Sequence, residues 1–476
     1  MKYCIITFGC QMNEADSDLM ASLLGRAGWQ ACEADEEADL GVRNTCSVRE
    51  RPEHKVFSLL GEMRPWKQSH PGAVLAVSGC MAQRAAQEIV RRAPHVDIVM
   101  GTGAFHRVEE YFERAREGRR PVVALDMDED PSAARARQPY VGAQHAVPLR
   151  AFVPVIRGCS NFCSYCIVPY VRGPEASRSP SEIRREVESL VARGTREVTL
   201  LGQNVLAYGR DLARVPQASA CTFPQLLLDL SRIEGLWRIR FTTCHPRDVD
   251  PGVISAMAEI DKVCEHIHLP IQAGTDRLLR EMNRGYTADR YLEVVGELRA
   301  RVPGIAITTD IMVGFPGESE DDFEKSLRLY EKIRFDGAFM FAYSPRPGTK
   351  AAALDNQLPR SVRLERLARV IEMQNRITIE KNEAAVGEEV ELLVDGPAAR
   401  GEGLLAGRAR NNKQVIFPAL GSGFVKPAAG FTNPAPSPSL PGSLVTVRLT
   451  EAHLWGFSGE LDAGELPEAS KPAPLF

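Results

Sequence analysis

Three cysteines stand close together in the chain, at Cys159, Cys163 and Cys166, separated by three residues and then by two. A structural zinc ion is usually held by two Cys-x-x-Cys pairs that are far apart in the sequence. Three thiolates on one loop instead suit a four-iron cluster, because they leave one iron open for a small ligand. A closed metal site is the alternative, whereas unrelated core cysteines are not typical of a loop.

Three further cysteines, Cys10, Cys46 and Cys80, each lie just beyond a predicted strand or in a loop. Loops at strand ends are where α/β folds collect ligands, so these thiols could converge on a second site. Their wide spacing carries no local signature, and structural roles are the alternative. The odd total of 11 cysteines argues against a disulfide framework. We interpret the remaining five as structural thiols: Cys4, Cys32, Cys221, Cys244 and Cys264.

Alternating strands and helices are predicted to position Cys10, Cys46 and Cys80. Residues 1–115 predict a small, doubly wound α/β domain. Its predicted strands span 4–8, 74–77 and 97–100. Residues 116–145 are polar and rich in Arg, Ala and Pro, which indicates a linker.

Residues 146–380 continue the strand–helix rhythm. Six strands are predicted, at 152–156, 197–201, 238–242, 266–270, 306–313 and 337–343. Strands that alternate with helices form a parallel sheet, and six units give a partial (β/α)6 barrel. Such barrels carry their chemistry at the C-terminal ends of the strands, which is where Cys159 follows the first strand.

The last part of the chain changes to an all-β pattern. Residues 381–463 predict a small β-barrel of the oligonucleotide-binding (OB) kind. Within it, residues 421–441 are rich in Gly, Pro and Ser and are predicted to be a flexible insertion. Residues 464–476 are predicted to be a tail. The predicted fold class is therefore α/β, with a doubly wound domain, a partial barrel and a C-terminal β-barrel.

Composition excludes few classes of function. The 476 residues are 44% hydrophobic and 25% charged, with a formal net charge of −4, which is ordinary for a globular protein. The N-terminal apolar run is too short for a signal peptide. No run of about 18 apolar residues is present that could span a membrane. We therefore expect a cytoplasmic protein with no membrane partner, and we expect a monomer.

The cysteine motif at 159–166 resembles the radical S-adenosylmethionine (SAM) superfamily. The segments around the other candidate cysteines resemble the N-terminal signature of its methylthiotransferase family: Thr7–Glu14, Asn44–Glu50 and Ser78–Gln83. The likeness covers nearly the whole chain, through Ile167–Gly173, His268–Gln272, Met282–Thr287, Thr309–Glu318 and Tyr343–Thr349. Gly407–Lys413 resembles the RNA-binding TRAM domain. The chain departs from the family at Pro174, where Arg is frequent, and at Ala273, where Ser is usual.

The resemblance implies two [4Fe-4S] clusters, one on each set of three cysteines, together with SAM. One SAM would be cleaved at the first cluster to a 5′-deoxyadenosyl radical, and the second cluster would carry the sulfur. The segments Gln11–Asn13 and Ser47–Glu50 are most similar to the branch that methylthiolates carbon 2 of N6-dimethylallyladenosine at position 37 of tRNA. That carbon bears an unactivated hydrogen, which no side-chain base removes, so a redox cofactor must supply the chemistry.

Two groups of side chains are candidates for binding. Polar residues at strand ends, with the tyrosine of the cysteine motif, are candidates to bind SAM: Tyr165, Gln203, Asn204, Gln272 and Asp310. Basic residues after the motif and in the small barrel are candidates to bind tRNA or substrate: Arg172, Arg178, Arg408, Arg410 and Lys413. Ordinary packing is the alternative for Tyr165, and salt-bridged loops are the alternative for Arg172 and Arg178.

The resemblance also implies partners. These are tRNA with N6-isopentenyladenosine in its anticodon loop, a reduced electron donor such as a flavodoxin or ferredoxin, and a donor of sulfur or of iron–sulfur clusters. One alternative is the same chemistry on threonylcarbamoyl-adenosine in tRNA or on a ribosomal protein. An alternative of a different class is a non-catalytic RNA-binding protein with a structural metal site.

Overall fold

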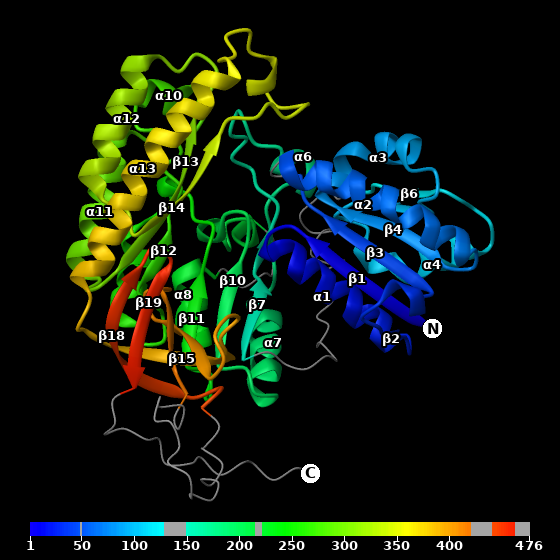
Figure 1. Cartoon of the computed structure of the whole chain (residues 1–476), viewed down its shortest axis with the longest axis horizontal. Coiled ribbons are helices and arrows are strands. Elements are labelled where there is room, and N and C mark those ends of the chain that lie inside the picture. Colours follow the sequence, from blue (N-terminus) through cyan, green and yellow to red (C-terminus); the bar gives the residue numbers. More distant parts are fainter. Residues whose placement is uncertain (48–49, 128–148, 215–220, 420–439, 462–476) are drawn as a thin grey trace, which may run out of the picture.

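The computed structural model describes residues 1–47, 50–127, 149–214, 221–419 and 440–461. These residues form an N-terminal parallel sheet, a central open barrel and a small closed β-barrel (Figure 1). The α/β fold class predicted from the sequence is confirmed. The predicted insertion at 421–441 lies almost wholly outside the described residues, and the predicted tail lies entirely outside them.

Six strands form the N-terminal sheet: β1 (Lys2–Phe8), β2 (Gln30–Ala31), β3 (Leu40–Thr45), β4 (Val74–Gly79), β5 (Ile98–Met100) and β6 (Val122–Ala124). They are parallel, in the order β2-β1-β3-β4-β5-β6. The predicted strands correspond to β1, β4 and β5, whereas β2, β3 and β6 were not predicted; β6 extends the sheet into the segment predicted as a linker. Strands β3 and β4 are buried along their whole length, as expected when helices cover both faces of a sheet.

Four helices cover this sheet: α1 (Gln11–Arg26), α2 (Glu50–Ser69), α3 (Cys80–Arg92) and α4 (Val108–Arg116). Apolar residues of α1 and α4 form a core with one face of the sheet, which includes Leu40 and Val74. Apolar residues of α2 and α3 form a second core with the other face, which includes Leu75 and Val77. The sheet is therefore doubly wound, as the sequence predicts.

Six parallel strands form the central barrel: β7 (Arg150–Pro154), β10 (Glu197–Leu201), β11 (Arg238–Phe241), β12 (His266–His268), β13 (Ala306–Val313) and β14 (Gly337–Ala342). They make two sheets, β11-β10-β7 and β12-β13-β14. A parallel bridge between Ile239 and Val263 connects the two sheets. All six strands lie within two residues of the predicted positions at each end.

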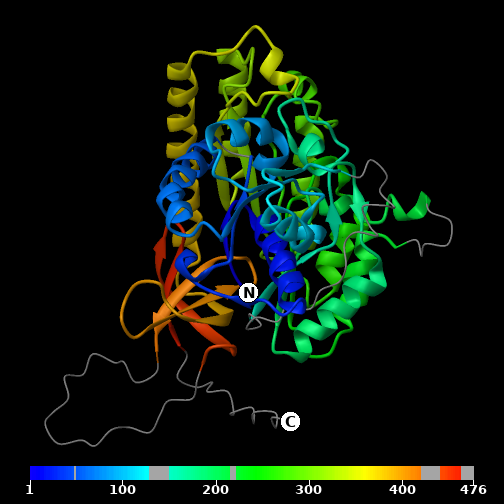
Figure 2. The ribbon, with the colours of Figure 1, turned by 90° about the vertical axis from the view of Figure 1, so that its right-hand side faces the viewer.

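The helices of the barrel follow its strands: α7 (Pro180–Ala192), α8 (Phe223–Ser231), α9 (Pro251–Glu259), α10 (Asp276–Glu281), α11 (Ala288–Arg301) and α12 (Glu320–Ile333). Their apolar faces pack with the strands into one large core. A longer helix, α13 (Arg360–Ala384), runs down the molecule to the small barrel (Figures 1 and 2). None of the described helices combines the length and apolar character that crossing a membrane requires.

The small barrel is closed by five strands: β15 (Glu389–Pro397), β16 (Leu404–Ala409), β17 (Gln414–Pro418), β18 (Leu444–His453) and β19 (Gly456–Leu461). They pair in the order β15-β16-β17-β19-β18. Inward-facing side chains such as Val394, Phe417 and Val447 are fully buried in its core. The β-barrel predicted at 381–463 is therefore present.

Buried arginines attach the small barrel to the side of the central barrel where the strands begin. Arg238, the first residue of β11, donates to the backbone oxygens of Arg408 (2.7 Å) and Glu391 (3.1 Å) and to the Glu391 carboxylate (2.6 Å). Arg240 donates to the backbone oxygens of residues 409 and 410. Because both arginines are almost fully buried, these bonds fix the small barrel opposite the C-terminal ends of the strands.

We expect the substitution Arg238→Ala to weaken this attachment, because it leaves buried carbonyl groups without a donor. The free energy of unfolding, measured by denaturant titration, should fall by about 2–4 kcal/mol. Arg290 is a matched control, because it pairs with Glu293 (3.0 Å) at an exposed site. Arg290→Ala should change the free energy by less than about 0.5 kcal/mol. Equal losses for the two variants would contradict this description of the attachment.

Candidate active site

The cysteine loop, residues 159–166, follows the first barrel strand. Its base is closed by a short antiparallel pair, β8 (Ile156–Arg157) and β9 (Ala176–Ser177). The backbone N–H of Cys159 donates to the backbone oxygen of Gly173 (3.1 Å). The backbone of Ser164 also bonds with later parts of the barrel. Backbone hydrogen bonds therefore hold the loop that carries the three thiols at the C-terminal end of the barrel, as predicted.

A buried arginine, Arg284, faces the cysteine loop. Its Nη1 lies 3.4 Å from the sulfur of Cys163 and 3.4 Å from the hydroxyl oxygen of Tyr165. Burial raises the pKa of Cys159 to about 11 and that of Cys166 to about 12. The positive charge of Arg284 acts in the opposite direction and favours the thiolate form that a metal requires.

The N-terminal cysteine set, Cys10, Cys46 and Cys80, follows the ends of β1, β3 and β4. These strands are neighbours, and their register aligns their last residues. The three cysteines therefore leave the sheet at one edge. A hydrogen bond with Cys46 lowers the pKa of Cys10 to about 6, and the charge of Arg172 acts in the same direction. Both effects favour the thiolate form that a metal ligand requires.

Two fully buried asparagines fasten the strand ends beneath this set. Asn13 Nδ2 donates to Asn44 Oδ1 and to the backbone oxygen of Thr45, both at 3.1 Å. Asn44 Nδ2 donates back to the backbone oxygen of Asn13 (2.8 Å). The Cys10 thiol donates to Asn13 Oδ1 (3.5 Å). Gly79 has a φ of +94°, and a Cβ there would lie 2.3 Å from the Thr45 oxygen, so only glycine permits this approach.

Helix α6 (Val168–Arg172) brings the two cysteine sets together. It begins two residues after Cys166, and Ile167 and Val171 pack against Cys80. Helix α6 also lies against α3, the helix that starts at Cys80 (Figure 1). Both sets, distant in sequence, thus adjoin one short helix.

A buried ion triad, Asp16, Arg157 and Arg172, ties this arrangement together. Asp16 accepts from Arg157 through Oδ1 and from Arg172 through Oδ2, each at 2.8 Å. The carboxylate is completely buried, and Arg172 is 3% exposed. Arg172 Nε also lies 3.2 Å from the sulfur of Cys80. Removing one member of a buried ion pair costs about 3–5 kcal/mol, so the triad firmly joins the sheet to the cysteine loop.

The residues at both sets fit iron–sulfur clusters. Each set offers three thiols, the donor that iron–sulfur clusters use. At the N-terminal set, three buried polar atoms have no hydrogen-bond partner and are free to donate: Arg172 Nη1, Ser47 Oγ and Ser78 Oγ. Across the described ranges, no group of three His, Cys, Asp or Glu side chains is arranged to hold a single metal ion. A cluster accepts a wider spacing, because each thiolate binds a different iron.

Known proteins place the chain in a family. Residues 153–330 match the radical SAM superfamily, and residues 2–101 match a family described as "Uncharacterized protein family UPF0004".

The chain is 46% identical over 463 residues to a Moorella thermoacetica protein, and the match covers 97% of this chain and 98% of that one. That relative is a tRNA-2-methylthio-N(6)-dimethylallyladenosine synthase. The chain belongs to this synthase family. The synthase of Carboxydothermus hydrogenoformans is 43% identical, with 96% and 99% coverage.

Solved structures confirm the fold. The radical SAM methyltransferase TsrM from Kitasatospora setae, with cobalamin and a [4Fe-4S] cluster bound, has a TM-score of 0.53 at 14% identity. The match covers 85% of this chain and 80% of TsrM. The cobalamin-dependent radical SAM enzyme OxsB has a TM-score of 0.51 at 10% identity, with 79% and 56% coverage. Membership of the synthase family makes SAM and [4Fe-4S] clusters the cofactors of this chain.

Two of the residues predicted to bind SAM lie at the cysteine loop. Tyr165 is half-buried and faces Arg284. Gln203 Oε1 accepts from the backbone N–H of Gly158, at the start of the loop (2.5 Å). Gln203 therefore supports the loop through one end of its amide. SAM binding by Tyr165 and Gln203 stays a prediction.

The other three predicted SAM ligands lie along the barrel. Asn204 is buried and donates to Asp248 Oδ2 (2.6 Å), while its Oδ1 is buried without a partner. Gln272 has a φ of +67°, and its backbone N–H donates to the backbone oxygen of Asp310 (2.9 Å). The carboxylate of Asp310 lies 3.5 Å from His268 Nε2. The described contacts bring none of these three directly to the cysteine loop.

Arg172 and Arg178, which are predicted to bind tRNA or substrate, are both buried, and that role stays a prediction. Arg172 belongs to the buried ion triad. Arg178 is 6% exposed, donates to the backbone oxygen of Pro154 (2.8 Å) and pairs with Glu186 (2.6 Å). Both guanidinium groups thus form ion pairs inside the protein, although Arg172 Nη1 has no partner. Their positive charge could be read from the sequence, but their ion-pair partners could not.

The residues of the small barrel that are predicted to bind RNA also have partners within the protein, and their role in binding stays a prediction. Arg408 donates to the backbone and side-chain oxygens of Asn412. Arg410 binds both carboxylate oxygens of Glu265, at 2.7 and 2.8 Å, and Lys413 donates to a backbone oxygen just before β14 (2.8 Å). Arg410 and Lys413 therefore bridge the small barrel to the central barrel. All three residues lie at this attachment, where the barrel strands begin, rather than at the cysteine loop.

Sequence reasoning assigned no role to several residues that matter at the site. Arg284 had only its place in the matched segment Met282–Thr287 as a signal. His245 follows β11, is 4% exposed and has a buried Nε2 without a partner. Burial lowers the pKa of His245 to about 2, assisted by the charge of Arg284, so its ring is neutral at physiological pH. Asp16 carried no local signal, because both of its partners come from another part of the chain.

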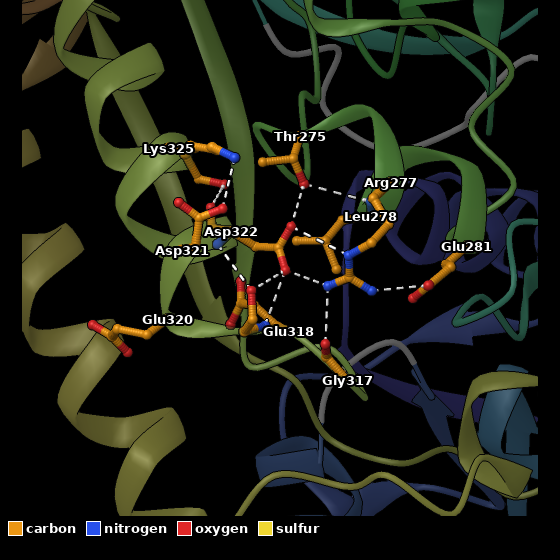
Figure 3. Close-up of polar contacts among 12 residues, drawn as sticks. Thr275, Arg277, Leu278, Glu281, Gly317, Glu318, Glu320, Asp321, Asp322 and Lys325 are labelled. Carbon is orange, nitrogen blue, oxygen red and sulfur yellow. Dashed lines mark hydrogen bonds and ion pairs between the residues drawn. The ribbon is translucent and has the colours of Figure 1, made fainter.

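A polar network fixes the helix that precedes Arg284 (Figure 3). Buried Asp322 accepts from Thr275 Oγ1 (3.1 Å) and pairs with Arg277. Arg277 also donates to the backbone oxygen of Gly317 (2.9 Å). These bonds connect the start of α10 to α12. Because Arg284 follows α10 closely in the chain, α10 sets its position beside the cysteine loop.

We expect Asp16→Asn to disrupt the N-terminal cysteine set, because the substitution leaves Arg157 and Arg172 buried without a counter-charge. The free energy of unfolding should fall by about 3–5 kcal/mol. Iron in anaerobically reconstituted protein should fall from about eight to about four atoms per chain.

Glu14→Gln on the exposed face of the same helix is the matched control, and it should retain full iron content and stability. Loss of iron from Glu14→Gln, or full iron in Asp16→Asn, would show that the triad does not support the cluster.

Proposed function

We propose that this protein methylthiolates carbon 2 of N6-dimethylallyladenosine at position 37 of tRNA, next to the anticodon, in a SAM-dependent reaction. The observation that carries the proposal is that two three-cysteine sets both adjoin α6. The reaction needs a place to cleave SAM and a place to hold sulfur, both within reach of one carbon atom. The names of the near-full-length relatives support the substrate.

In this proposal the cysteine loop holds the SAM cluster and the N-terminal cysteine set holds the auxiliary cluster. The bound clusters and SAM supply the radical chemistry that an unactivated aromatic C–H bond requires. Arg284 then balances the charge of the thiolates in the cysteine loop. Arg172 does the same for Cys80, and its unpartnered Nη1 is available to the sulfur atoms of the auxiliary cluster.

Neutral side chains would orient the substrates at the mouth of the barrel. His245 presents an unpartnered Nε2 there, and its ring packs edge-on against Tyr286. Asn204 likewise presents a buried Oδ1 without a partner. A single hydrogen bond from each would place SAM or the nucleoside without adding charge to the site. Tyr165 and Gln203 are the SAM ligand candidates nearest the cysteine loop.

The proposed partners follow from this chemistry. The substrate is tRNA that already carries the N6-isopentenyl group. The SAM cluster must be reduced by a protein electron donor, such as a flavodoxin or ferredoxin. The auxiliary cluster must be rebuilt after each turnover by a donor of sulfur or of clusters. We propose that the protein works as a monomer in the cytoplasm.

Nucleoside analysis of tRNA tests the proposal directly. Cells that lack the protein should accumulate N6-isopentenyladenosine and lose its 2-methylthio derivative, and the gene should restore it. Loss of 2-methylthio-threonylcarbamoyl-adenosine, or of a methylthio group on a ribosomal protein, would instead assign one of the alternative substrates.

Single cysteine substitutions separate the roles of the two sets. Cys163→Ala and Cys80→Ala should each reduce the iron content to about four atoms per chain. Neither variant should form the methylthio nucleoside, because each set is needed for a different half of the reaction. Cys221→Ala, which removes a thiol outside both sets, should retain about eight irons and full product. Zinc in place of iron in the wild-type protein would contradict the proposal.

A further inference from the structure

Two exposed aromatic side chains stand beside the cysteine loop. Phe162 lies inside the loop and is 48% exposed, and Tyr170 on α6 is 44% exposed. Their ring centroids are 6.0 Å apart, and the ring planes meet at 77°. Isolated exposed apolar residues are common on protein surfaces. This pair differs from them because it lies at the loop that we assign to the SAM cluster.

The backbone of Phe162 is strained, and its neighbours hold it in place. Its φ of +47° is in the left-handed region, which bulky residues rarely adopt. Asn283 Nδ2 donates to the backbone oxygens of Asn161 (3.1 Å) and Phe162 (3.0 Å), and Arg247 donates to Asn161 Oδ1 (2.5 Å). Strained residues that their surroundings fix in this way cluster at functional sites. Here the fixed backbone conformation keeps the phenyl ring of Phe162 exposed to solvent.

We infer that Phe162 and Tyr170 form a stacking platform for an unpaired base of the tRNA anticodon loop, adjacent to the adenosine that is modified. The inference rests on the proposed function. The target carbon must approach the clusters, so the neighbouring nucleotides must lie at the rim of the site, where this pair is. Unpaired bases stack on aromatic rings whatever their sequence. The half-exposed Arg247 adds a cation beside the platform.

Binding of a short RNA tests the platform. The probe is an anticodon stem-loop with N6-isopentenyladenosine in the loop and fluorescent 2-aminopurine as its neighbour, and the protein is the iron-loaded full chain. Wild-type protein should bind it and change the 2-aminopurine fluorescence. Phe162→Leu and Tyr170→Leu should each bind roughly ten-fold more weakly. Phe162→Tyr keeps an aromatic ring and should bind like the wild type.

Controls separate stacking from damage to the loop. Iron content and thermal stability should be unchanged in Phe162→Leu. Phe162→Gly suits a positive φ and should fold at least as stably, yet it should bind RNA as weakly as Phe162→Leu. Leu228→Ala removes a side chain of similar exposure (46%) from α8 and should leave binding unchanged.

The outcomes are distinct. Wild-type affinity in Phe162→Leu and Tyr170→Leu would overturn the inference while leaving the proposed function intact. Normal RNA binding combined with slower reduction by flavodoxin would also overturn it, and would assign the pair to the electron donor. Failure of the wild-type protein to bind the stem-loop would refute the proposed function, and the inference would fall with it.

Discussion

A fully buried carboxylate, Asp16, is shared by two arginines that flank the cysteine loop. Arg157 precedes the loop and Arg172 follows it, whereas Asp16 belongs to the first helix of the N-terminal sheet. Because a buried charge must keep its partners, this bond pattern permits one relative position of sheet and loop. The same Arg172 also contacts Cys80. One ion triad therefore sets the geometry of both cysteine sets.

The two ends of the central barrel have separate tasks. The C-terminal ends of the strands carry the cysteine loop and face the N-terminal sheet, and Leu201 at the end of β10 packs against residues of α1. The other ends hold the small barrel through Arg238 and Arg240. This division explains why a cluster of basic residues in the small barrel does not face the reacting end. Its arginines and lysine are used for attachment.

Much of this could be predicted from the sequence, because the signals were local. The three-and-two spacing of the cysteine loop, the alternation of strands and helices, and the change to an all-β pattern in residues 381–463 are each encoded by residues close together in the sequence. Strands β2, β3 and β6 were not predicted, and the three residues of β6 lie in a segment with a linker-like composition. Residues whose roles depend on distant partners could not be assigned. Asp16 and Arg284 are examples, and the ion pairs of Arg172 and Arg410 could not be predicted because their partners are distant in the sequence.

The central claim is that two iron–sulfur sites adjoin α6, with Arg172 at the end of this helix in contact with Cys80. The most direct test is a crystal structure of the anaerobically reconstituted protein, with iron located by anomalous scattering. We predict two separate iron clusters, one on Cys159, Cys163 and Cys166 and the other on Cys10, Cys46 and Cys80. Iron at the cysteine loop alone, or two clusters with the ion triad disrupted, would contradict this account.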